Sequence, residues 1–464
     1  MQGSPDTHEG LRKAVRSLLS EPRLRDETRR CWAAAEHGMP HAAAVYRELG
    51  ARRWLAPHWP ERYGGLGAGP YAAAVVAEEL ALAGVPDSAR VNTIDNAGAS
   101  LLTGGTGEQR SRHLPAMAEG RSLFSVLYTE PDAGSDLAAL TTTAEPAGEG
   151  WRLDGVKVWN GRTAEAEFAV CAARAVPPPG GSETPADRAG LGGRAERGAK
   201  AAPGGHAESG GRAGARSGGK HAGLSLFIVP LDTPGVHVDP LDTLNPEQLF
   251  RVRLDGVETG PDALVGAPGG GWPLITEALG LERTGICFAG RARRWFDNLV
   301  SALDASGRLE EETKRHALDE LDAELRAARL LSWRAVQDLD TGRQNGAAAA
   351  GAKWWASELA QRVALLAGQL LGAPAWADTA GADPAGAVGA AGAAGEASTA
   401  GTVTGPDAVA SGAQEDLPFA EAFPDLAVAL AEAPGLTLAA GTSPMQLDAV
   451  ATELLDGGDP WEGE

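Results

Sequence analysis

The sequence predicts an α+β fold with a helical N-terminal domain, an antiparallel β domain in the middle and a helical C-terminal domain. Up to residue 123, apolar residues lie three and four positions apart with charges between them, which is typical of amphipathic helices. From 124 to 265, short apolar runs are separated by closely spaced proline and glycine, which is typical of antiparallel strands. The helical pattern then returns. We therefore expect domains at 1–123, 124–265 and 266–464.

Each domain has its own characteristic segments. The helical pattern of the first is clearest in AAAVVAEELALAG (72–84) and EQRSRHLPAMAEG (108–120). The strand-like runs of the second are LFSVLY, WRLDGVKVW, FAVCAARA, LSLFIVPLD, GVHVDPL and LFRVRLDGV. The third has WPLITEALGLERTGICFAG (272–290), a long helical run over 308–371 and a last helical segment near 445–455.

Two segments show neither the helical nor the strand-like pattern. Residues 177–222 are rich in Gly, Ala, Arg and Ser, and residues 373–414 are mostly Ala and Gly. Such segments have too few apolar side chains to offset the entropy of ordering them. We expect both to be disordered insertions at the surface.

Composition excludes several classes of protein. A formal charge of −21 argues against nucleic acid and against an anionic membrane surface. Cys31, Cys171 and Cys287 are odd in number and far apart, so neither a disulfide framework nor a metal-ligand spacing is present. No apolar run is long enough for a signal peptide or a membrane span. We expect a reduced, soluble, cytoplasmic protein without a metal site.

One loop has polar groups that could bind a ligand. LYTEPDAGSD (127–136) ends an apolar run, and its proline and glycine force a tight turn. The turn carries hydroxyls on Thr129 and Ser135 together with free backbone N–H groups, and Trp159 follows soon after it. Such a loop could bind something planar and polar, or it could be an ordinary acidic turn.

With this loop at the start of the β domain and helices on both sides of that domain, the chain resembles the acyl-CoA dehydrogenase family of flavoenzymes. The similar segments occur in the family's order and cover most of the chain outside the two insertions. They are LAPHWPERYGGLG (55–67), GTGEQRSRHLPAMAEG (105–120), LYTEPDAGSDLAAL (127–140), LDGVKVW (153–159), FIVPLDTPGVHV (227–238), GWPLITEALGLERTG (271–285) and PGLTLAAGTSPMQ (434–446). The resemblance implies a β-barrel middle domain, a C-terminal helical bundle and FAD as cofactor.

The resemblance also implies which residues hold FAD. Backbone and hydroxyl groups of the 127–136 loop would bind the pyrimidine edge of the flavin, and Trp159 would cover one face of its ring. Ser135 would also lie close to the acyl thioester. The FAD-binding residues implied in this way are Val126, Tyr128, Thr129, Gly134, Ser135, Trp159, Gly161, Gln369, Thr442 and Ser443.

The reaction implied is α,β-dehydrogenation of an acyl thioester, which needs a carboxylate base in an apolar pocket. The family places this glutamate at one of two positions, and the commoner one is Ala440 here. The other is Glu282 in GLERTG, expected on the first helix after the β domain, with Arg283 near the substrate. The alternative interpretation of Glu282 is a solvated helix glutamate.

Three functions remain open from the sequence. The first is an FAD-dependent dehydrogenase of acyl-CoA or of acyl-carrier-protein thioesters, which passes electrons to an acceptor such as an electron-transfer flavoprotein. The second is a catalytically silent subunit of a heteromeric dehydrogenase, because Gly161, Pro444 and Leu447 depart from the family's FAD-binding pattern. The third is a flavin monooxygenase on the same fold. A homo- or hetero-oligomer is expected, since FAD in this family lies at a subunit interface.

Overall fold

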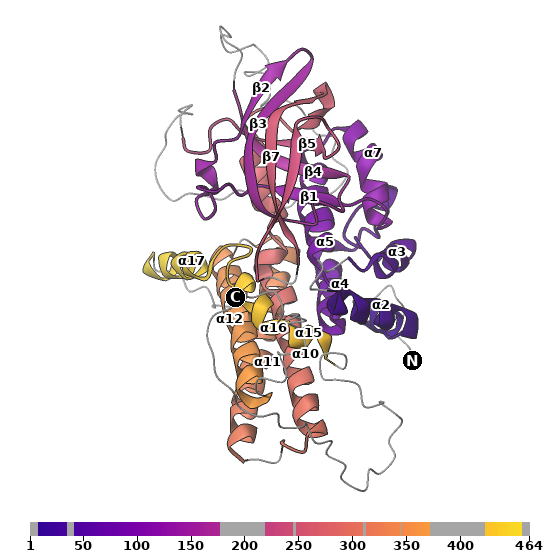
Figure 1. Cartoon of the computed structure of the whole chain (residues 1–464), viewed down its shortest axis with the longest axis vertical. Helices are drawn as coiled ribbons and strands as arrows, with labels where there is room; N and C mark the ends of the chain where they lie inside the picture. Colours follow the sequence, from indigo (N-terminus) through magenta and orange to yellow (C-terminus); the bar gives the residue numbers. More distant parts are fainter. Residues whose placement is uncertain are drawn as a thin grey trace, which may run out of the picture.

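The computed structural model describes residues 8–34, 41–176, 219–244, 247–309, 312–343, 345–371 and 423–456. The β-sheet lies at one end of the long axis and the C-terminal helices lie at the other, with the N-terminal helices along one side (Figure 1). This is the helix–sheet–helix order that the sequence predicts. Of the two expected insertions, 177–222 and 373–414, residues 177–218 and all of 373–414 lie outside the described residues, whereas 219–222 form a turn just before the strand β5 (Leu224–Pro230).

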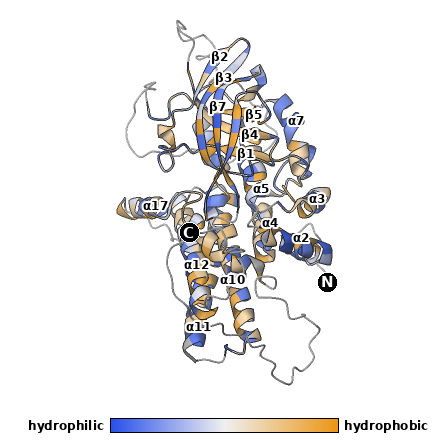
Figure 2. Ribbon diagram, in the orientation of Figure 1, coloured by the Kyte–Doolittle hydropathy of each residue, from blue (hydrophilic) through white to orange (hydrophobic). Residues whose placement is uncertain are grey.

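The N-terminal region is helical. The elements are α1 (His8–Leu19), α2 (Pro22–Ala33), α3 (Ala43–Ala51), η2 (Glu61–Tyr63), α4 (Gly69–Ala83), α5 (Ser88–Arg90), the π-helix η3 (Val91–Gly98), α6 (Ala99–Gly104) and α7 (Gly107–Ala118). Helix α4 packs against α1 and against the C-terminal helices α10 (Ile286–Ala305) and α11 (Glu312–Asp340). Every residue from Ala72 to Ala81 in α4 is buried. The stretch includes Glu78 and Glu79, whose carboxylates are paired with Arg12, Arg16 and Arg329. By contrast α2 is polar and largely blue in Figure 2.

The start of α7 shows how local sequence sets a boundary. Thr106 Oγ1 accepts a hydrogen bond from the Gln109 N–H at 3.1 Å, and Gln109 Oε1 accepts one from the Thr106 N–H at 2.8 Å. This reciprocal pair is a capping box, which satisfies two backbone donors at the helix end.

The middle of the chain forms one sheet. Its strands are β1 (Phe124–Leu127), β2 (Thr143–Ala147), β3 (Gly150–Gly161), β4 (Phe168–Ala175), β5 (Leu224–Pro230), β6 (Val236–Leu241), β7 (Leu249–Thr259) and β8 (Leu264–Val265). The order is β6-β7-β3-β2-β4-β5-β8, and β1 pairs with β4 off this path. The pairs β2–β3, β4–β5 and β6–β7 are antiparallel, as predicted.

The sheet also contains two parallel pairs, β1–β4 and β2–β4, which the sequence did not predict. Consecutive strands form the antiparallel pairs β2–β3, β4–β5 and β6–β7, and the antiparallel pairs β3–β7 and β5–β8 join strands further apart in the chain. Of the parallel pairs, β2–β4 has one strand between its members and β1–β4 has two. Apolar alternation identifies a strand but carries no information on the direction of its partner.

The C-terminal helices begin with α9 (Gly271–Ala278) and a short 3₁₀ turn, η6 (Glu282–Thr284). Then follow α10 (Ile286–Ala305), α11 (Glu312–Asp340), α12 (Gly346–Leu371), α15 (Pro424–Ala427), α16 (Ala429–Leu436) and α17 (Ser443–Leu455). The run expected over 308–371 is two long helices, because the chain turns at Gly342, whose φ is +71°. Among the described helices, none combines the length and the apolarity needed to cross a membrane.

Candidate active site

The 127–136 loop is held by a buried ion pair. The Glu130 carboxylate accepts hydrogen bonds from the backbone N–H of Thr141 at 2.7 Å and of Thr142 at 2.9 Å. It also accepts one from Lys157 Nζ at 2.8 Å, and Lys157 donates a second bond to the Tyr128 carbonyl at 3.1 Å. Lys157 has no exposed surface. The glutamate of this loop is therefore a structural anchor.

The charge state of Glu130 follows from these contacts. Burial alone would raise the pKa of its carboxyl, but Lys157 and the N–H and hydroxyl donors of Thr141 and Thr142 lower it to about 2. The carboxylate is thus ionised throughout the neutral range. The ion pair between Glu130 and Lys157 is therefore maintained throughout this range.

Trp159 presents an aromatic ring beside the loop. Its side chain is 58% exposed, although its neighbours Val158 and Asn160 are buried. Its φ is +64°, an uncommon conformation for a bulky residue, and it lies at a register shift between β3 and β7. The Val158 N–H donates to the Thr129 carbonyl at 2.9 Å, which ties this part of β3 to the loop. Backbone strain of this kind clusters at ligand-binding sites.

These residues fit an isoalloxazine ring. Gly134 and Ser135 are exposed, Thr129 is half-buried, and the exposed face of Trp159 is an aromatic surface next to them. Together they supply polar groups for a flavin edge and an apolar wall for its face. Gly161 follows in the same strand, with its carbonyl held by Asn92 Nδ2 at 3.2 Å and by Ser125 Oγ at 3.1 Å.

Glu282 lies in the η6 turn and not on a helix, which corrects the expectation from the sequence. The α9 helix ends at Ala278, and η6 is closed by Gly285, whose φ is +74°. A Cβ atom on Gly285 would lie 2.9 Å from the Cα of Lys353, so only glycine permits this close approach to α12. The turn therefore places Glu282 next to the start of α10 and against α12.

The pKa of the Glu282 carboxyl is raised well above its ordinary value. Burial raises the pKa of its carboxyl to about 7, and the charges of Asp95 and Asp87 act in the same direction. The nearby cations Lys353 and Arg283 oppose this shift. The Glu282 residue is half-buried, its backbone carbonyl accepts from the Gly285 N–H at 3.2 Å, and its carboxyl has neither a hydrogen bond nor an ion pair among the described residues.

Lys353 is a buried cation that the sequence analysis missed. It lies on α12 and has no exposed surface. Its ammonium donates to the carbonyls of Leu436 at 3.1 Å and Gly441 at 2.9 Å, and it lies 5.2 Å from the centre of the Phe288 ring. Burial lowers its pKa to about 8, against the charge of Glu282. A lysine inside the apolar run AAAAGAKWWASELA was the available signal.

The sequence analysis also missed the buried pair Arg90 and Asp95. Arg90 Nη1 lies 3.0 Å from Asp95, and Arg90 Nη2 lies 3.6 Å from Cys287 Sγ. Burial raises the pKa of Asp95 to about 6, with Arg90 opposing the shift. Asp95 belongs to the π-helix η3, a kind of irregularity that is frequent at functional sites.

The remaining residues implied by the resemblance lie on separate elements. Gln369 is exposed in the last turn of α12. Thr442 is the N-cap residue of α17, and Ser443 Oγ donates to Glu358 Oε1 at 2.5 Å. Val126 is half-buried in β1, and Tyr128 is buried. Arg283 is half-buried, and its burial lowers its pKa.

The C-terminal motif departs from the family pattern at Ala440 and Pro444, and the structure shows how both residues fit at the start of α17. Pro444 lies in the first turn of α17, where the N–H that proline lacks would have no helical partner. Ala440 has a φ of +55°, and its carbonyl accepts a bond from Gln446 Nε2 at 2.8 Å. Lys353 thus connects the 436–441 segment, whose carbonyls it binds, with the turn that contains Glu282. In the described part of the chain, no hydrogen bond joins Gln369, Thr442 or Ser443 to the 127–136 loop.

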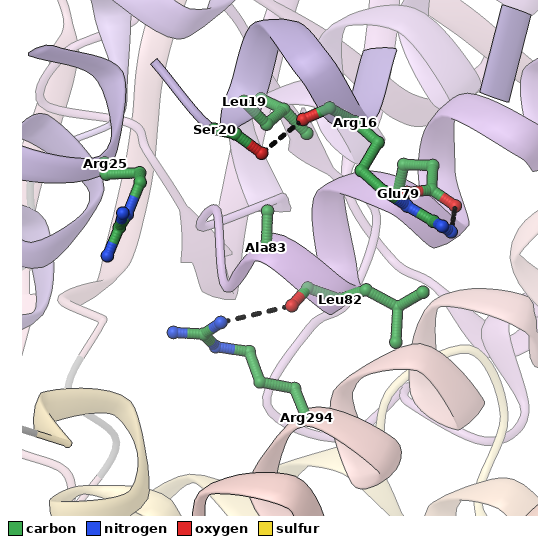
Figure 3. Close-up of a pocket in the computed structure, with 8 residues that line it drawn as sticks. All are labelled: Arg16, Leu19, Ser20, Arg25, Glu79, Leu82, Ala83 and Arg294. Carbon is green, nitrogen blue, oxygen red and sulfur yellow. Dashed lines mark hydrogen bonds and ion pairs between the residues drawn. The ribbon is translucent and has the colours of Figure 1, made fainter. Parts of the chain in front are cut away.

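A pocket of about 280 Å³ lies elsewhere, between α1, α2, α4 and α10 (Figure 3). Two of its arginines are engaged: Arg16 with Glu79 at 2.8 Å, and Arg294 with the Leu82 carbonyl at 3.1 Å. None of the candidate site residues lines it.

The described residues also contain no group of three or more His, Cys, Asp or Glu that could hold a metal.

The chain is similar to known protein families along most of its length. The chain matches the family profiles "Acyl-CoA dehydrogenase, N-terminal domain" over residues 5–121, "middle domain" over 125–191 and "C-terminal domain" over 269–391. Members of this class are FAD-binding oxidoreductases. The chain belongs to the acyl-CoA dehydrogenase family.

Two relatives from Mycobacterium tuberculosis are similar in sequence. Acyl-CoA dehydrogenase FadE29 is 30% identical, over 74% of this chain and 80% of that protein. Acyl-CoA dehydrogenase FadE34 is 32% identical over 60% of this chain, and the match spans 31% of that longer protein.

Solved structures agree on the fold. The structure named "Tcur3481-Tcur3483 steroid ACAD" is 25% identical with a TM-score of 0.72, and the match covers 98% of this chain and 99% of that one. A glutaryl-coenzyme A dehydrogenase complex is 21% identical with a TM-score of 0.70, covering 97% of this chain and 95% of that one. These matches confirm the predicted α+β fold class.

Proposed function

We propose that this chain is an FAD-dependent dehydrogenase of acyl thioesters, carried on CoA or on an acyl-carrier protein, with Glu282 as the catalytic base. The observation that carries the proposal is the environment of Glu282. Its carboxyl is held in a glycine-closed turn without a hydrogen-bond partner among the described residues, and burial brings its pKa to about 7. A general base works best when its pKa lies near the working pH.

FAD, when bound, supplies the acceptor for the β-hydride. The chain's own residues supply the rest. Glu282 takes the α-proton, and its desolvation makes the ionised form more basic than a surface carboxylate. Trp159 gives the ring an apolar wall, and the 127–136 loop, fixed by Glu130, offers polar groups for the flavin edge. Lys353 holds the 436–441 segment against the turn that carries Glu282.

Substrate binding and electron transfer are parts of the same proposal. We assign Ser135 and Arg283 to thioester binding, since Ser135 is exposed at the loop and Arg283 adjoins Glu282. An electron-transfer flavoprotein is the proposed acceptor. The proposal is tested by anaerobic bleaching of the flavin absorbance with acyl thioesters, which reports hydride transfer without the natural acceptor.

A second candidate function is a silent subunit that completes the FAD site of a partner chain. Two observations favour it: Gly161 lacks a hydroxyl next to the flavin loop, and Leu447 is exposed and uncharged on α17. The structure named "ChsE4-ChsE5 complex" belongs to a similar fold made of two different chains. Purification of this chain alone distinguishes the two, since a silent subunit would be colourless and would not bleach.

We expect bleaching by thioesters to become faster as pH rises through about 7. Glu282 accepts a proton only when ionised, and its pKa is raised to about 7. A profile of kcat/KM against pH should therefore show an acid limb with an apparent pKa near that value. Because folding favours the protonated form, the same group stabilises the fold most below its unfolded pKa and loses this contribution as pH rises through about 7. A limb near pH 4 would contradict the assignment.

We expect Lys353→Met to move this acid limb to higher pH. The ammonium of Lys353 opposes the rise in the pKa of Glu282, so its removal raises that pKa further. The substitution also removes the donor to Leu436 and Gly441, which could lower the rate without any electrostatic effect. The pH at the midpoint of the limb separates the two, because a purely structural effect lowers the plateau and leaves the midpoint unchanged.

A further inference from the structure

The cavity between α1, α2, α4 and α10 is lined by basic and apolar side chains (Figure 3). Arginines from three helices reach it: Arg16 of α1, Arg25 of α2 and Arg294 of α10. Leucine and alanine side chains at the ends of α1 and α4 supply its apolar surface. Its volume of about 280 Å³ is just below the range of about 300–1,000 Å³ typical of sites for drug-sized ligands, so it fits a small ligand.

Two of these arginines are fixed by neighbouring groups but keep free donors. Arg16 donates from Nε and from Nη2 to the Glu79 carboxylate, both at 2.8 Å. Arg294 donates from Nη1 to the Leu82 carbonyl at 3.1 Å and from Nε and Nη2 to the Asp425 carboxylate. Because a guanidinium has five N–H donors, at least two remain on each arginine. Donors that are already held in place lose little freedom when they bind a ligand.

The third arginine, Arg25, lies near the start of α2 and is exposed. Its guanidinium has neither a hydrogen bond nor an ion pair among the described residues. The helix begins at Pro22 without a side-chain cap and without an acidic residue in its first turn. Since the N-terminus of a helix favours negative charge, an arginine here is electrostatically unfavourable by itself. A bound anion would compensate both the arginine and the helix end.

The cavity has an excess of positive charge, although the whole chain carries a formal charge of −21. Among the described residues that line it, Glu79 is the only carboxylate, and both of its oxygens accept hydrogen bonds from arginines. With the ion-paired neighbours included, five arginines stand against three carboxylates, which leaves two positive charges. They are Arg12, Arg16, Arg25, Arg294 and Arg329 against Glu78, Glu79 and Asp425. A ligand with two negative charges would balance this surplus.

We propose that this cavity binds a phosphate group, either as inorganic phosphate or on a small organic molecule. Because the guanidinium groups come from three helices, the acceptor must present oxygens in several directions. A tetrahedral phosphate does so, whereas a carboxylate presents two coplanar oxygens. The leucine and alanine surface would contact an organic part. The site is separate from the candidate active site, so the inference goes beyond the proposed function.

The test measures binding to the purified full-length protein by isothermal titration calorimetry. The probes are inorganic phosphate, n-butyl phosphate and succinate, at one ionic strength because salt screens exposed charges. At least one of the two phosphates should bind at least about 10-fold more tightly than succinate, since one more charge-assisted hydrogen bond is worth about that factor. Tighter binding of n-butyl phosphate than of inorganic phosphate identifies an organic phosphate as the ligand, and equal binding identifies the free ion.

A single variant locates the binding. Arg25→Gln should weaken phosphate binding by at least about 10-fold, because it removes a charged donor from the site. The fold should be retained, since the guanidinium contacts no described partner, and thermal unfolding checks this. The matched control is Arg29→Gln, an exposed arginine one turn further along α2 that does not line the cavity and should keep the affinity.

Three results would each overturn the inference. They are no saturable binding of either phosphate, equal loss of affinity in Arg25→Gln and Arg29→Gln, and binding of succinate as tight as that of phosphate. Phosphate binding that is lost in Arg25→Gln and kept in Arg29→Gln supports it. Calorimetry reads these outcomes without flavin chemistry, so they do not depend on whether the chain is a dehydrogenase.

Discussion

Glu282→Gln should lower the rate of flavin bleaching by an acyl thioester by about 10²- to 10⁴-fold while FAD stays bound. Glutamine keeps the shape and the polarity of the side chain but cannot accept the α-proton. The environment of Glu282 makes this the largest effect expected on activity. Its carboxyl has a pKa near 7, whereas exposed glutamates titrate near pH 4. The measurement is single-turnover bleaching under anaerobic conditions, with the flavin content determined for each variant.

The control for this prediction is Glu277→Gln. Glu277 lies one turn earlier, at the end of α9, and is exposed with a single bond from Thr103 Oγ1 at 3.1 Å. Its substitution should leave bleaching unchanged. A bleaching rate for Glu282→Gln equal to that of the control would remove Glu282 from the mechanism.

A second carboxylate position allows a rescue experiment. Ala440 occupies the position where relatives more often carry the base, and Lys353 holds the neighbouring Gly441 carbonyl close to the Glu282 turn. Adding Ala440→Glu to Glu282→Gln should restore part of the rate if both positions reach the same α-carbon. The positive φ of Ala440 is a cost that any side chain at this position shares.

Much of the fold could be predicted from the sequence because its signals are local. Helical spacing, strand-like runs and the Thr106–Gln109 capping box depend only on neighbouring residues. The parallel pairing of β4 with β1 and β2 could not be predicted, since it joins strands that are distant in the chain. The break between α11 and α12 was missed because the helical spacing continues on both sides of Gly342.

The candidate site was predicted only where a motif marks it. The 127–136 loop, Trp159 and Glu282 were identified through the resemblance, but the roles of buried charges were not. Lys353, Arg90 and Asp95 act through partners on other elements, at distances that no spacing along the chain records. Even the loop glutamate, Glu130, was unassigned, because its function depends on Lys157 in a strand 27 residues away.

Lys157→Met is expected to destabilise the middle of the chain by about 3–5 kcal/mol, the usual cost of removing one partner of a buried ion pair. The substitution leaves the Glu130 carboxylate, 4% exposed, with only the donors of Thr141 and Thr142. The free energy of unfolding would be measured by urea denaturation at pH 7, followed by circular dichroism. Arg152→Met is the matched control, because it breaks an exposed pair with Glu145 on the same sheet and should cost less than about 1 kcal/mol.

The pH dependence shows whether the charge of Glu130 causes this loss. In the native protein the pKa of Glu130 is lowered to about 2, so its contribution to stability is complete above the unfolded value, near 4, and is lost as pH falls towards 2. Without Lys157, burial dominates and raises the pKa of Glu130, so the variant should regain stability as pH falls from 7 to 5. Glu130→Gln combined with Lys157→Met should remove that dependence and recover part of the lost stability, since no buried charge remains. Equal losses for Lys157→Met and Arg152→Met would mean that the buried pair does not hold the loop, and the anchor assigned to Glu130 would be wrong.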